Sequence, residues 1–162
     1  MDSFEQSHLD LRIRRATNAD AERIESLVFA TLREHGLEPD PEGTDTDLRD
    51  IESSYQKSGG LFEVIEDGAG NLLGTVGLYP LDIETCELRK MYFAPSLRGR
   101  GLGLRVLERM VEAARRLGFK RMTLETASVL DKAIRLYTRF GFVPYEAEHR
   151  STRSDRSYFM DL

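Results

Sequence analysis

The segment Arg98-Gly99-Arg100-Gly101-Leu102-Gly103 combines glycines and arginines at a spacing that could bind an anion. Glycine lacks a side chain and adopts positive φ readily, so a turn built from it leaves backbone N–H groups accessible. A helix that begins at such a turn adds the positive end of its dipole, and the usual anion at such a site is phosphate. Arginine adds a cationic fork for phosphate oxygens. The segment therefore predicts a phosphate-binding turn.

The glycine spacing excludes two common phosphate loops. A dinucleotide-binding loop needs Gly-x-Gly-x-x-Gly, and counting from Gly99 and Gly101 puts Leu104 in place of the third glycine. A Walker A loop ends in Gly-Lys-Ser/Thr, and no such tripeptide follows. What remains is Arg-x-x-Gly-x-Gly, beginning at Arg98. The alternative is a tight turn between a strand and a helix that carries an exposed arginine.

A strand before the turn and a helix after it would position these residues. Residues 87–93 alternate apolar and polar side chains, as a half-buried strand does, and Pro95 ends the run. After the turn, apolar residues recur at helical spacing until Gly118, which favours a helix end. These apolar residues are Leu102, Val106, Met110, Ala113 and Leu117.

In this setting, Arg-x-x-Gly-x-Gly resembles the pyrophosphate loop of the GNAT acyltransferase superfamily, whose members use acyl-CoA. The resemblance implies that backbone N–H groups of the turn hold the CoA pyrophosphate. The cradle would consist of Arg98, Gly99, Gly101 and Gly103, with backbone contacts from Arg100 or Leu102. It also implies that the preceding strand binds the pantetheine arm and polarises the thioester carbonyl through its backbone. The main chains with that role would be those of Met91, Tyr92 and Phe93.

Glu87 is the candidate general base, because some family members place a glutamate at this point of the strand. An amine with a pKa of about 10 is almost wholly protonated at neutral pH, so losing a proton helps it to attack. A period of two puts Glu87 on one face with Arg89, Met91 and Phe93. A buried carboxylate there would have a raised pKa. The alternative is a surface glutamate that is solvated or neighbours Arg89, and Glu84 is the second choice of base.

Tyr137 is the candidate general acid. Residues 133–142 resemble the family's helix-to-strand signature, in which a tyrosine commonly lies beside the CoA sulfur. A phenol with a pKa of about 10 is neutral at working pH and can protonate a leaving thiolate. The alternative is a core tyrosine that packs with Leu136 and Phe140. In one departure from the family pattern, Leu130 stands where many relatives carry an asparagine that binds the cofactor.

The whole pattern predicts one α/β domain, residues 1–162, with an α+β mixed sheet that is antiparallel at its start. Strands are expected at 9–16, 61–66, 72–79, 85–93 and 121–126, with two weak ones near 143–148 and 156–161. Helices are expected between Thr17 and Gly36, through Leu48, Ile51 and Tyr55, at 101–117 and from Ser128 to Phe140. This order, β-α-α-β-β-β-α-β-α-β(-β), resembles the single-domain GNAT fold.

Composition limits the class of function. A net charge of −5 argues against non-specific nucleic-acid binding. Cys86 is the sole cysteine, and His8, His35 and His149 lie far apart, so neither a disulfide within the chain nor a metal site is expected. No apolar run is long enough to span a membrane, and residues 1–10 are unlike a signal peptide. A cytoplasmic protein is therefore expected.

Together these features predict a transferase: an acetyl-CoA-dependent N-acetyltransferase in which the primary amine of a small molecule attacks the thioester directly, without a metal. Acetylation of a protein, at a lysine or an N-terminus, and a non-catalytic acyl-CoA-binding module are the alternatives. The sequence does not choose between Glu87 and a water relay as the base, nor among acceptors, acyl chains or oligomeric states. If the chain forms a homodimer through its C-terminal strands, as many relatives do, the contact would be Tyr158-Phe159-Met160.

Overall fold

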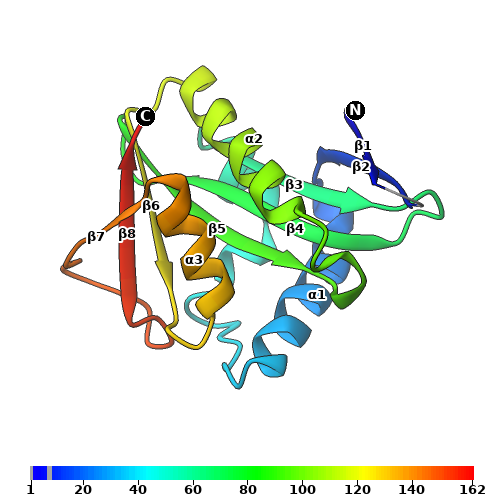
Figure 1. The fold of residues 1–162 in the computed structure, drawn as a ribbon, viewed down its shortest axis with the longest axis horizontal. Coiled ribbons are helices and arrows are strands. Elements are labelled where there is room, and N and C mark those ends of the chain that lie inside the picture. Colours follow the sequence, from blue (N-terminus) through cyan, green and yellow to red (C-terminus); the bar gives the residue numbers. More distant parts are fainter. Residues whose placement is uncertain (1, 7–8) are drawn as a thin grey trace.

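The computed structural model describes residues 2–6 and 9–162. Within them, eight strands form one sheet in the order β1-β2-β3-β4-β5-β6-β8-β7 (Figure 1). Their bounds are β1 Asp2–Gln6, β2 Leu9–Arg15, β3 Leu61–Glu66, β4 Leu72–Pro80, β5 Thr85–Phe93, β6 Arg121–Thr126, β7 Val143–Pro144 and β8 Arg156–Asp161. Neighbours are antiparallel except β5 and β6, which are parallel. Only β1 was not predicted, because its five residues lack apolar alternation.

Helices cover both faces of the sheet. Helices α2 (Leu102–Arg116) and α3 (Asp131–Phe140) lie over one face, and α1 (Ala21–Glu34) lies over the other (Figure 1). Short helical turns complete the set: η1 Asn18–Asp20, η2 Thr46–Arg49, η3 Glu52–Gln56 and η4 Pro95–Leu97. No helix in the described residues is long and apolar enough to cross a membrane.

The regular helix predicted through Leu48, Ile51 and Tyr55 was wrong. The chain instead forms the 3-10 turn η2 and then the π turn η3. Asp50 separates them at φ −138° and ψ 82°, and its carboxylate accepts hydrogen bonds from the Ser53 N–H and the Asn18 amide. The apolar spacing nevertheless predicted burial correctly, since Leu48, Ile51 and Tyr55 are at most 1% exposed. Asp50 interrupts the helix because its side chain satisfies backbone groups locally.

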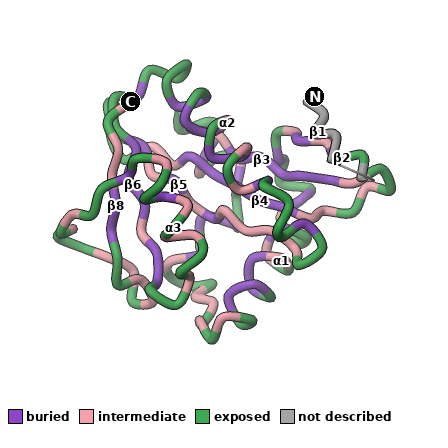
Figure 2. The backbone as a smooth tube through the Cα atoms, viewed as in Figure 1, coloured by how far each residue is buried: buried purple, intermediate pink, exposed green. Residues whose placement is uncertain are grey.

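Two layers of apolar side chains hold the fold together. Figure 2 colours the buried residues of the sheet and the helices purple. One layer lies between the sheet and helices α2 and α3, and includes Leu88, Val106 and Met110. The other lies between the sheet, α1 and the turns η2 and η3, and includes Tyr55 and Phe62. Burying both faces fixes the ends of the central strands relative to the helices.

Strands β5 and β6 part along their length. They pair only from Thr85 opposite Arg121 to Leu88 opposite Leu124, although β5 continues to Phe93. Figure 1 shows the two ribbons diverging beyond this point. The edge of β5 that faces β6 therefore has no strand partner from residue 89 onward.

A β-bulge at Lys90 interrupts β5. Lys90 has φ 55°, the left-handed region that residues other than glycine rarely adopt. Across the pair of strands, Gly77 opposes Arg89 and Thr75 opposes Tyr92, so β5 contains one more residue than β4 over this interval. The Thr75 hydroxyl donates a hydrogen bond of 2.7 Å to the Lys90 carbonyl and holds the bulge in place.

The bulge overturns one prediction about this strand. Because the extra residue reverses the alternation, Tyr92 shares a face with Glu87 and Arg89. Met91 and Phe93 instead pack against the core beneath α2 and α3. The prediction that Glu87, Arg89, Met91 and Phe93 share one face was therefore wrong, since a period of two holds only while every residue of a strand is extended.

Candidate functional site

A cleft of about 1100 Å³ opens where β5 and β6 part. Its walls come from the end of β5, the turn before α2, the start of α3, and the loops 37–47 and 149–154. The predicted site residues that line it are Glu87, Met91, Tyr92, Phe93, Arg98, Gly99, Leu102, Gly103 and Tyr137. Arg100 and Gly101 belong to the same turn but do not line the cleft. The structure thus brings the residues predicted to bind the cofactor and those predicted to act in catalysis together in one cleft.

The glycines of the turn serve different purposes. Gly99 and Gly101 have φ of 75° and 74°, and nothing lies within 4 Å of a Cβ placed on either. Backbone conformation, and not space, therefore requires glycine at these two positions. A Cβ on Gly103 would lie 3.1 Å from a methyl group of Leu136. Gly103 therefore allows the first turn of α2 to approach α3 closely.

Arg98 has protein partners at its guanidinium group. It forms an ion pair with Glu34 and donates hydrogen bonds of 3.0 and 3.1 Å to the Phe93 carbonyl. The hydrogen bond from Arg98 lowers the pKa of the Glu34 carboxyl. In this structure the Arg98 side chain ties the turn to α1 and to the end of β5. Its predicted contact with a phosphate stays a prediction.

Tyr137 lies on α3 with 7% of its surface exposed. Its ring packs edge-on against Phe142, with ring centroids 5.9 Å apart. Burial, followed by the charge of the ionised Tyr92, raises the pKa of the phenol. No described residue forms a hydrogen bond with its hydroxyl group, although Tyr137 lines the cleft. The phenol is therefore protonated at neutral pH, and Tyr137 is one of the residues that line the cleft.

Glu87 lies beside Arg89, as one of the sequence alternatives expected. The carboxylate accepts a hydrogen bond from the Arg89 Nε, and both side chains line the cleft. The Arg89 guanidinium also lies over the ring of Tyr79, with 3.8 Å between Cζ and the ring centroid. Glu84, the second choice of base, belongs to the turn that leads into β5 and does not line the cleft.

A buried cluster of charges supports the bulge, and the sequence prediction did not include it. The Lys90 ammonium is 3.2 Å from a carboxylate oxygen of Asp45 and of Asp47. Arg153 binds both oxygens of Asp45, at 2.7 and 2.8 Å, and the Tyr55 hydroxyl donates to Asp47. The cluster joins the bulge to the loops 37–47 and 149–154. No sequence pattern marks it, because 108 residues separate Asp45 from Arg153.

The Asp45 carboxylate makes folding sensitive to acid. Burial alone would raise its pKa, but hydrogen bonds from Arg153 and the Asp40 N–H and the charge of Lys90 outweigh burial and lower it to about 2. The pKa in an unfolded chain is about 3.9, so the stabilisation amounts to about 2–3 kcal/mol. It is complete above about pH 5 and is lost as the pH falls towards about 2.

We expect an Asp45→Asn variant to be less stable than wild type at neutral pH, and the difference to shrink as the pH falls from about 5 to about 2. Thermal unfolding of both proteins across this range measures the difference. A difference in Tm that stays constant with pH would contradict the assigned ionisation. Asp10→Asn, at an exposed position of β2, serves as the control.

Residues 21–142 match the acetyltransferase (GNAT) family. An uncharacterized N-acetyltransferase of Escherichia coli K12, YjgM, is 37% identical over 135 residues, 80% of each chain. The structure of a GNAT-family acetyltransferase from Staphylococcus aureus superposes with a TM-score of 0.87 at 22% identity, over 94% of this chain and 99% of that one.

A second solved structure adds bound molecules to the comparison. Spermidine N-acetyltransferase from Vibrio cholerae, in complex with CoA and spermine, superposes with a TM-score of 0.68 at 20% identity. The superposition covers 93% of this chain and 95% of that one. The fold predicted from the sequence is confirmed by these two structures.

Proposed function

We propose that this chain, which belongs to the acetyltransferase (GNAT) family, transfers an acetyl group from acetyl-CoA to the primary amine of a small molecule. Family membership makes it an acyl-CoA-dependent acetyltransferase. What we propose beyond this is that the donor is acetyl-CoA and that the acceptor is a small primary amine. One observation carries them: the cleft between β5 and β6 is lined by residues of the glycine turn, by the unpaired edge of β5 and by Tyr137.

The turn before α2 suits the pyrophosphate of CoA. Left-handed Gly99 and Gly101 have open space around them, and Gly101 caps the N-terminus of α2, where the positive end of the helix dipole lies. The Arg98 side chain is held by Glu34, so the backbone of this turn would make the phosphate contacts. Lys132 on α3, which also lines the cleft, would add a cation for a phosphate.

The chemistry is a direct transfer. The amine gives up a proton towards the Glu87 carboxylate, directly or through water, and its nitrogen attacks the thioester carbonyl carbon. An N–C bond forms as the C–S bond breaks, and the Tyr137 hydroxyl gives its proton to the leaving sulfur. The second proton that the nitrogen loses on becoming an amide then restores the phenol. Backbone N–H groups near Met91 and Tyr92 stabilise the charge that develops on the carbonyl oxygen. Tyr137 suits its role because its raised pKa keeps it protonated.

The acceptor side of the cleft favours a small molecule over a protein segment. The loops 37–47 and 149–154 both line it. Ion pairs between Asp45 and Arg153 join these loops, and a hydrogen bond from Arg153 to the Glu38 carbonyl adds to the connection. A bridge of this kind narrows the approach for an extended chain. The spermine bound to the Vibrio cholerae enzyme is consistent with a small amine here.

Two measurements test this function. Calorimetry should detect micromolar binding of acetyl-CoA and none of a nicotinamide dinucleotide. With acetyl-CoA present, some primary amines should cause release of free thiol. Glu87→Gln should slow this release at neutral pH, and the deficit should shrink as the pH approaches the amine pKa of about 10. The absence of acetyl-CoA binding would refute the proposed function.

A further inference from the structure

We propose that the acceptor is an amino carboxylate, in which Arg89 binds the carboxylate and Glu87 lies beside the amine. The inference rests on the proposed function and specifies its substrate class. It follows from the arrangement of charged side chains in the cleft.

Arg89 differs from other cations of the cleft in its partners. The lysines and arginines that line the cleft are Arg89, Lys90, Arg98, Lys132, Arg150 and Arg153. Apart from Arg89 and Lys132, each has a carboxylate or a backbone carbonyl at its terminal nitrogen atoms. Arg89 donates to Glu87 through Nε and also interacts with the Tyr55 hydroxyl, but no described carboxylate or carbonyl accepts a hydrogen bond from its two Nη atoms. A half-buried guanidinium with such donors suits an anionic ligand.

A stack of aromatic rings holds Arg89 in place. Its guanidinium lies 3.8 Å from the centre of the Tyr79 ring, and Tyr79 packs edge-on against Tyr55 at 5.6 Å. Tyr55 is fully buried and its hydroxyl is bound to Asp47. Stacking occupies a face of the guanidinium and leaves its edge available for hydrogen bonds. The group is therefore oriented before a ligand binds, which lowers the entropic cost of binding.

The spacing of Glu87 and Arg89 matches the two charges of an amino acid. The two residues are two positions apart on β5, on one face of the strand, and their charged groups are in contact. An amine and a carboxylate on the same or a neighbouring carbon can lie beside this pair at the same time. An acceptor with a second ammonium in place of the carboxylate would be repelled by Arg89.

Matched pairs of acceptors test the inference. Each pair is an amino acid and the amine that it yields on decarboxylation, such as leucine and isoamylamine. Wild type should favour the amino acid in kcat/KM by about 10- to 100-fold, the range for charge-assisted hydrogen bonds. Arg89→Gln should remove most of this preference, because kcat/KM should fall much further for the amino acid than for the amine. Arg89→Lys, which keeps the charge without the fork, should retain an intermediate preference.

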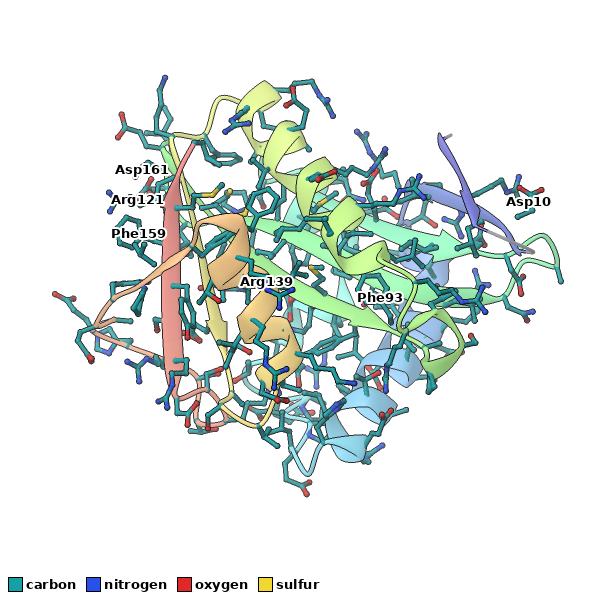
Figure 3. The ribbon with its side chains drawn as sticks, viewed as in Figure 1. Asp10, Phe93, Arg121, Arg139, Phe159 and Asp161 are labelled. Carbon is teal, nitrogen blue, oxygen red and sulfur yellow. The ribbon has the colours of Figure 1, made fainter. Side chains whose placement is uncertain are left out.

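Arg121 provides the matched control (Figure 3). It lies over the ring of Phe159 at 4.4 Å and donates through Nε to Asp161, so its surroundings resemble those of Arg89. It does not line the cleft. Arg121→Gln should therefore leave the preference for amino acids unchanged. Thermal unfolding and the affinity for acetyl-CoA establish that each variant is folded.

The outcomes separate this inference from the proposed function. If wild type acetylates amines without favouring their amino-acid partners, the inference fails and the proposed function stands. If Arg89→Gln lowers kcat/KM equally for both members of each pair, Arg89 is structural and the inference also fails. If acetyl-CoA binds but no amine of either kind is acetylated, the proposed function itself fails.

Discussion

Gly101→Val is expected to abolish acetyl-CoA binding while the protein still folds. Gly101 has φ 74° and caps the N-terminus of α2, so a β-branched residue there would force the backbone out of its left-handed conformation. The N–H groups of the turn would then no longer converge on the pyrophosphate. Losing two charge-assisted hydrogen bonds would raise the Kd about 100-fold or more, which calorimetry would measure.

Gly118→Val is the matched control for this experiment. Gly118 is also left-handed, at φ 94°, is also exposed, and follows the other end of α2. Both valines should lower stability by about 1–2 kcal/mol through backbone strain. Only Gly101→Val should weaken acetyl-CoA binding. An unchanged affinity in a folded Gly101→Val protein would remove the phosphate-binding role from the turn.

Tyr137→Phe is expected to lower kcat by about 100-fold with little change in the affinity for acetyl-CoA, as is typical when one general acid is lost. Phenylalanine keeps the ring that packs against Phe142 and removes only the hydroxyl group. Since no described residue bonds to that hydroxyl, its removal leaves no protein group without a partner. Steady-state kinetics at saturating acetyl-CoA measures the effect.

Tyr158→Phe separates a chemical role from general damage to the core. Tyr158 lies on β8, is 6% exposed and does not line the cleft. The two variants should have similar Tm values, and Tyr158→Phe should retain the wild-type kcat. An equal loss of kcat and of acetyl-CoA affinity in Tyr137→Phe would assign Tyr137 a packing role instead.

The amino-acid sequence by itself determined the order of elements and the place of the glycine turn. Several patterns depend only on residues that are close in the sequence. They are the alternation in residues 85–93, the helical spacing from Leu102 and the helix end at Gly118. Left-handed Gly99 and Gly101 belong to the same class, because glycine tolerates positive φ wherever the chain folds. Local conformational preferences of this kind are readable without knowing the tertiary contacts.

Only the tertiary structure decided which side chains share the site. The bulge at Lys90 exchanged the faces of Met91 and Tyr92, and it depends on the Thr75 hydroxyl of a neighbouring strand and on Asp45 and Asp47 of a distant loop. Tertiary contacts also pair Glu34 with Arg98, which is 64 positions away in the sequence, and place the Tyr79 ring beneath Arg89. Such contacts bring residues remote in sequence together, so their partners are set by packing and not by local spacing.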